Sequence, residues 1–115
     1  MQAKATANIK IGAGYEFIRH LQFIDNYKDD IPTNITGWEF QGYVVPEGEA
    51  AVDFSVVIDD AINGLITISM PAVGTATLPK GRNAWYLLVK YYAEATPEVF
   101  IEGIAVVDTE VPLWR

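Results

Sequence analysis

The chain has 115 residues, a net charge of −7 and no cysteine. This length fits one domain that can bury enough surface to fold without disulfides or metals, so residues 1–115 are expected to form a single domain. Without cysteine, neither a disulfide framework nor a thiolate metal site can form. The acidic balance argues against nucleic acid and anionic membranes as partners, because both attract clustered Lys and Arg. The sequence also has no apolar run that could span a bilayer and no secretory signal after Met1.

Apolar residues alternate with polar ones along most of the chain, which predicts β-strands. The apolar positions are rich in the β-branched and aromatic side chains that suit a pleated sheet. No segment follows the helical period better, apart from a single turn within residues 73–78. The expected strands cover residues 8–11, 15–24, 35–45, 51–58, 65–70, 84–92 and 98–108.

The clearest alternation lies in residues 84–92, where Trp85, Leu87 and Val89 share one face. Trp85 and Trp38 are expected to anchor the core. In residues 15–24 a charged side chain, Arg19, falls on the apolar face.

Turn-forming residues separate these strands. Gly12 and Gly14 predict a break, residues 25–34 a surface loop, and residues 46–49 a turn. With no repeat and no second domain, about seven strands predict an antiparallel β-sandwich. Residues 1–7 are expected as a flexible arm or an edge strand, and residues 109–115 as a C-terminal tail.

Candidates for catalysis are few. His20 is the only histidine, and no Gly-x-Ser-x-Gly elbow accompanies it. The serines Ser55 and Ser69 fall inside expected strands. We therefore interpret His20 as a solvated surface residue.

Acidic residues could in principle bind calcium or hydrolyse glycosides. Asp59 and Asp60 lie before Asn63 and Gly64 in a loop-like stretch, with Asp29, Asp30 and Asp53 as further candidate ligands, but the ligand spacing of a calcium loop is missing, so turn chemistry is favoured. A carboxylate pair for glycoside hydrolysis would need a cleft, which a small filled sandwich hardly offers. We therefore expect no enzyme activity, no catalytic residue, no cofactor and no metal. The carboxylates that could form a pair for glycoside hydrolysis are Glu39, Glu47, Glu49, Asp53 and Glu102.

Aromatic residues exceed what one small core can use, and such residues are enriched at the centres of protein interfaces. Trp114 and Leu113 in the tail are the first interface candidates. Tyr43, Tyr86 and Tyr92 are the others.

Four short segments follow one another in a set order within residues 8–108: Asn34-Ile35-Thr36-Gly37-Trp38, Asn63-Gly64-Leu65-Ile66-Thr67-Ile68, Leu78-Pro79-Lys80-Gly81-Arg82 and Ile101-Glu102-Gly103-Ile104-Ala105-Val106. In this order they resemble the small Ig-like β-sandwich of tailed-phage structural proteins, in particular the N-terminal domain of phage baseplate upper proteins. Two departures stand out. Pro71 and Gly74 weaken the short helix usual before the Leu-Pro-x-Gly turn, and no long C-terminal region follows Arg115, so the chain resembles a stand-alone accessory protein of this fold.

The resemblance implies an Ig-like sandwich and a structural role in the virion at the tail, baseplate or fibre, after synthesis in the host cytoplasm. Its partners would be other virion proteins, and the chain would form a homo-oligomer or occur in several copies in a symmetric assembly. No catalytic residue is carried over. The alternative is a carbohydrate-binding module that stacks exposed aromatics on host glycans, and a small hydrolase is a weaker third reading.

Overall fold

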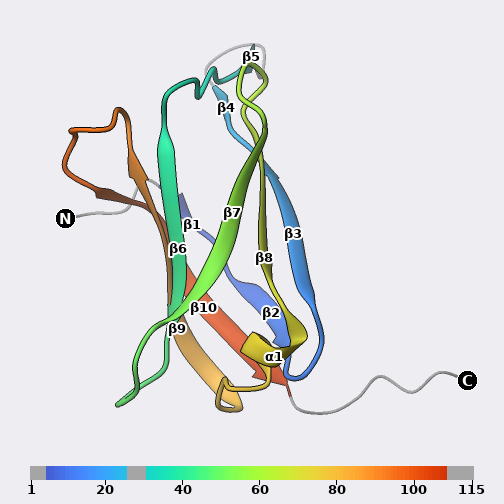
Figure 1. Ribbon diagram of the computed structural model, residues 1–115. Helices are drawn as coiled ribbons and strands as arrows, with labels where there is room; N and C mark the ends of the chain where they lie inside the picture. Colours follow the sequence, from blue (N-terminus) through green and yellow to red (C-terminus); the bar gives the residue numbers. More distant parts are fainter. Residues whose placement is uncertain (1–4, 26–30, 109–115) are drawn as a thin grey trace, which may run out of the picture.

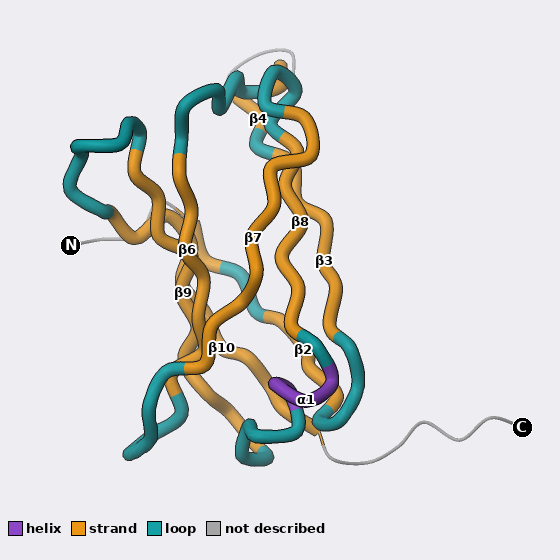
Figure 2. Tube along the Cα trace, in the orientation of Figure 1, coloured by secondary structure: helices purple, strands orange, loops and turns teal. Residues whose placement is uncertain are grey.

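A computed structural model describes residues 5–25 and 31–108 of the chain. As expected, the domain is all-β, with a single turn of helix (Figures 1 and 2). The predicted strands over residues 65–70 and 98–108 match two strands of the structure to the residue. The elements are β1 (Ala5–Thr6), β2 (Ile9–Gly12), β3 (Phe17–Gln22), β4 (Ile24–Asp25), β5 (Ile31–Pro32), β6 (Glu39–Val45), β7 (Val52–Asp60), β8 (Leu65–Met70), α1 (Ala72–Thr75), β9 (Gly81–Lys90) and β10 (Glu98–Asp108).

Eight strands form one mixed sheet that curls into a half-barrel (Figure 1). Their order is β1-β10-β9-β6-β7-β8-β3, and β2 lies beside β10. Strand β7 links the two halves, because Val52 to Phe54 pair with β6 whereas Ser55 and the residues after it pair with β8. The inner faces of the two halves therefore enclose one core.

The prediction of a purely antiparallel sheet is wrong at one end. Strands β1 and β2 both run parallel to β10. Alternation of apolar residues determines which face a strand buries but says nothing about its direction, so this pairing had no signal in the sequence. The finer expectation of an Ig-like sandwich stays a prediction.

Two expected strands are shorter in the structure because turns occupy their first residues. The strand expected from residue 35 begins at Glu39, since the Asn34 side-chain oxygen accepts a hydrogen bond from the Thr36 amide (3.0 Å) and Gly37 has a φ of +84°. Tyr15 belongs to the turn that follows β2, where its amide bonds to the Gly12 carbonyl. The small β4–β5 pair overlaps the expected loop over residues 25–34, with β4 beginning one residue before it, and residues 26–30 lie outside the described residues.

The core contains the residues that alternation placed inside. Trp85 is 1% exposed, as predicted, and its ring meets Phe54 edge-on. Trp38 is half-buried and packs against Phe23 and Tyr91 instead of lying fully inside. The buried hydrophobic residues are Ile9, Ile11, Phe17, Phe23, Ile35, Val44, Phe54, Ile66, Ile68, Met70, Leu78, Trp85, Leu87, Val89, Ile101, Ala105 and Val107.

The connection between β8 and β9 contains α1, close to where a single turn was predicted. Pro71 precedes the helix and Gly74 lies within it, and the helix spans only four residues. Thr75 is fully buried: its hydroxyl donates to the Tyr15 carbonyl (2.7 Å) and accepts from the Gly14 amide (3.0 Å). This side chain fastens α1 to the turn between β2 and β3.

Candidate interaction surface

Tyr43 and Tyr86 form a pair on the outer face of the sheet. They lie opposite each other on β6 and β9, with ring centroids 5.7 Å apart and ring planes at 45°. Their strand neighbours Val44 and Trp85 point into the core, so alternation directs the two tyrosines outward. Both rings are half-buried.

The pair lies in a row that crosses four strands. Asp53 of β7 is opposite Tyr43, and Glu102 of β10 is opposite Tyr86. Antiparallel partners share a face, so two exposed carboxylates flank two aromatic rings. Half-buried apolar residues continue this surface on both sides of the row, and we call the whole the tyrosine face: Tyr43, Tyr86, Asp53, Glu102, Val45, Ala84, Leu88, Val99 and Ile104.

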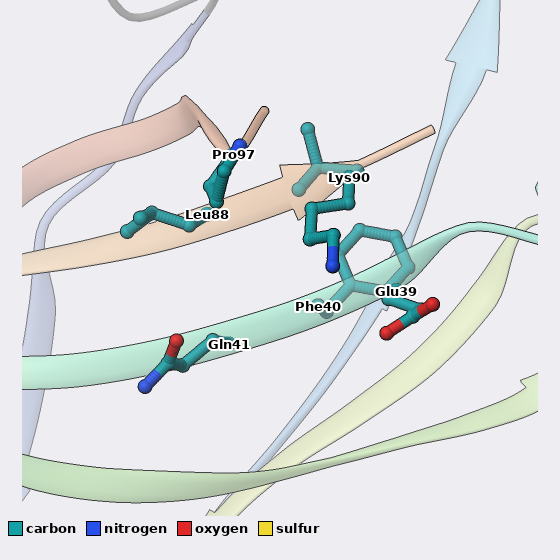
Figure 3. Close-up of a pocket in the computed structure, with 7 residues that line it drawn as sticks. Glu39, Phe40, Gln41, Leu88, Lys90 and Pro97 are labelled. Carbon is teal, nitrogen blue, oxygen red and sulfur yellow. The ribbon is translucent and has the colours of Figure 1, made fainter. Parts of the chain in front are cut away.

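A shallow hollow of about 200 Å³ adjoins the tyrosine face (Figure 3). Its lining includes Pro97 and the pair Glu39 and Lys90, which are opposite each other in the β6–β9 register. Ligand pockets usually hold roughly 300–1,000 Å³. The hollow is therefore small for a ligand site. It makes the surface beside the tyrosine face uneven.

Tyr92 stands apart from this pair. It is 61% exposed, six positions past Tyr86 and beyond the end of β9. Leu113 and Trp114 lie outside the described residues. Of the three candidates that the structure describes, it brings together Tyr43 and Tyr86, and the interface role of all five residues stays a prediction.

His20 takes part in a polar chain on the outer face of β3, β8 and β7. Thr67 donates its hydroxyl hydrogen to the Asp59 carboxylate (2.5 Å), so it can only accept from the Nδ1–H of His20 (2.8 Å). This order of groups places a proton on Nδ1 of His20. Threonine stands between histidine and carboxylate, so the chain is not a nucleophile–histidine–acid relay, in which histidine is the central group.

Asp60 shows the turn chemistry predicted for residues 59–64. Its carboxylate accepts hydrogen bonds from the side-chain amide of Asn63 (2.8 Å) and from the Asn63 backbone N–H (3.3 Å). These bonds, the side-chain one first, lower the pKa of Asp60 from its ordinary value of 3.8. Within residues 5–25 and 31–108, no three acidic or histidine side chains converge as a metal site would require.

The glutamates considered for glycoside chemistry are not gathered in one cleft. Glu39 lines the hollow beside Lys90, whereas Glu102 lines a separate, open one with Tyr86. In the described part of the chain, no helix is long and apolar enough to cross a membrane.

Sequence reasoning missed a larger hollow of about 370 Å³ between β3 and β1. Leu21, Phe23, Trp38 and Phe100 are among its lining residues, and the rings of Phe23 and Phe100 meet edge-on with centroids 4.9 Å apart. No local pattern could reveal this hollow, because it depends on how far the curled sheet stays open.

Comparison with solved structures shows that the chain has the fold of a domain from a phage protein. That domain is the N-terminal domain of phage TP901-1 ORF48, with a TM-score of 0.59 over 90% of this chain and 86% of that chain. The two are 18% identical, so the likeness concerns the fold. No family model and no curated protein matches the chain. The resemblance to phage modules drawn from the sequence is thereby confirmed at the level of the fold.

Proposed function

We propose that the chain is a non-enzymatic structural module of a phage virion that attaches to neighbouring virion proteins at the tail, baseplate or fibre. The observation that supports this most strongly is the fold match to a phage protein domain over 90% of the chain. The four short segments that follow one another in a set order along the sequence resemble those of phage baseplate modules. This resemblance also supports a role in the virion. Because fold alone does not determine function, the attachment surface has to be argued from residues.

The tyrosine face is the attachment surface in this proposal. Tyrosines offer a large contact area at a small entropic cost and are enriched where interfaces are buried. Tyr43 and Tyr86 hold each other in place, which reduces the freedom lost on docking. Asp53 and Glu102 beside them favour a partner that presents Lys or Arg around an apolar centre.

The same face is poorly shaped for the alternative role in glycan binding. Rings whose planes meet at 45° do not offer one flat platform to a sugar. Tyr92, the most exposed tyrosine, stands apart from the pair. These observations favour protein attachment, with several copies arranged under the symmetry of the particle.

Complementation tests the proposal. Phage lacking this chain would be supplied with wild-type protein, the double variant Tyr43→Ala Tyr86→Ala, or the control Ile62→Ala. Ile62 is 68% exposed and lies in the turn between β7 and β8, away from the tyrosine face. We expect wild type and the control to appear in purified particles and the double variant to be depleted at least about tenfold, as loss of hot-spot residues implies. Equal incorporation of all three would contradict the role of the tyrosine face in attachment. Binding of the pure protein to a glycan array would favour the carbohydrate-binding alternative.

A further inference from the structure

Strand β3 ends the hydrogen-bonded path of the curled sheet. Within the described residues it pairs with β8 and with no other strand. Alternate residues of a strand direct their N–H and C=O groups to opposite sides, so half of the β3 backbone groups face an open edge. Such an edge is a template for an added strand.

The side chains along this edge are self-complementary in one antiparallel register. If Ile18 lies opposite Ile18 of a second copy, Glu16 falls opposite His20 and Phe17 opposite Arg19, each pair occurring twice. Ile18 is 50% exposed, and Glu16 and His20 lie on its face of the strand. An apolar pair is thus flanked by two acid–histidine pairs.

His20 can take part in this contact through Nε2, because its Nδ1–H donates to Thr67 within the same sheet. A carboxylate only accepts hydrogen bonds, so Nε2 must also carry a proton to bond to Glu16 of the second copy. The imidazolium form of His20 is therefore the form that pairs with Glu16.

Arg19 bears on the choice of register. A charge on the inward side of an edge strand normally discourages pairing. Here the guanidinium lies 5.9 Å from the Phe17 ring centroid, and in the register centred on Ile18 it also meets Phe17 of the other copy. Centring on Arg19 would oppose two guanidinium groups, so Arg19 excludes the neighbouring register.

We propose that two copies of the chain associate through β3, antiparallel, with the two-fold axis at Ile18. The pairing would extend the curled sheet across both copies. Dimerisation through β3 is inferred from the edge strand and is independent of the proposed role in the virion. It is measured with pure protein, so a negative result would leave the proposed function untouched.

Sedimentation equilibrium of the full chain tests the register through residue 18. Ile18→Lys and Ile18→Glu should each weaken self-association at least about tenfold, because like charges then face each other. An equimolar mixture of the two variants should restore association to within about threefold of wild type, since opposite charges then meet. Val57→Lys is the matched control: Val57 is 52% exposed on the same outer face but lies on β7, away from the edge.

Hydrogen exchange of the wild-type chain gives a second readout that needs no variant. Amides on the open side of β3 should become protected as concentration rises into the dimeric range and lose protection on dilution. A wild-type chain that is monomeric up to about 1 mM, the weak end of specific binding, would overturn the proposal. So would an equimolar mixture of the Ile18→Lys and Ile18→Glu variants that fails to associate, or an equal weakening of self-association by Val57→Lys.

Discussion

The indole nitrogen of Trp85 donates a hydrogen bond of 2.8 Å to the carbonyl oxygen of Ala7, which joins β9 to the chain between β1 and β2. Ala7 approaches β10 closely: its amide bonds to the Glu102 carbonyl (3.0 Å), and a Cβ on Gly103 would lie 1.7 Å from its oxygen. Glycine at 103 is therefore required for the N-terminal segment to run this close to β10.

Gly103→Ala should displace this segment from β10. We expect a loss of about 2–3 kcal/mol in unfolding free energy, because two hydrogen bonds and their packing are lost while the core remains. Chemical denaturation measures the loss. In a chain lacking residues 1–7 the same substitution should cost much less. An equal cost in both chains would mean that Ala7 is not the cause.

Trp85 combines volume with this hydrogen bond, and two substitutions separate the contributions. Trp85→Ala should cost about 3–5 kcal/mol, the range for emptying a buried aromatic site. Trp85→Phe retains most of the packing and should cost about 1–2 kcal/mol, mainly for the unpaired Ala7 carbonyl. Both losses are measured by chemical denaturation. If Trp85→Ala cost less than about 1 kcal/mol, the assignment of this residue to the core would be wrong.

Thr75→Val tests how α1 is fastened to the turn between β2 and β3. Valine has the shape of threonine but cannot bond to the Tyr15 carbonyl or the Gly14 amide. Both hydrogen bonds are partly buried, so losing them should cost about 1–2 kcal/mol in unfolding free energy. Thr77→Val is the control, because the Thr77 hydroxyl donates to the Gly74 carbonyl at an exposed position. Equal stability of the two variants would contradict the fastening role.

Asp60 should contribute a pH-dependent part of stability. Its pKa is lowered in the folded chain by the Asn63 hydrogen bonds, so near that pH the unfolded state binds more protons than the native state. The contribution is present above the ordinary value of 3.8 and is lost as the pH falls through the lower folded pKa. Carboxyl NMR titration should show Asp60 titrating below 3.8 in wild type and closer to it in Asn63→Ala. No difference between the two proteins would contradict the assigned cause.

Local pattern was sufficient to predict which side chains of β8 lie inside. Ile66, Ile68 and Met70 are buried as their alternation predicted, because one face of β8 covers the core. Local pattern did not predict features that depend on how distant segments pair. The parallel direction of β2 and the role of Gly103 both depend on two segments, distant in sequence, that meet at β10.

The candidate surface was predicted only in part for the same reason. Tyr43 and Tyr86 were recognisable as outward-facing aromatics, but their contact follows from the β6–β9 register, which the sequence does not state. In the sequence alone, Asp53 and Glu102 are candidates only as carboxylates for metal or glycoside chemistry. Their position beside the tyrosines became visible once four strands were aligned.

Quantitative mass spectrometry of purified phage particles after a high-salt wash tests the proposed structural role in the virion. Peptides of this chain should remain with the particles at several copies each, as a symmetric assembly requires. Particles that are complete and infectious but contain no trace of the chain would contradict it.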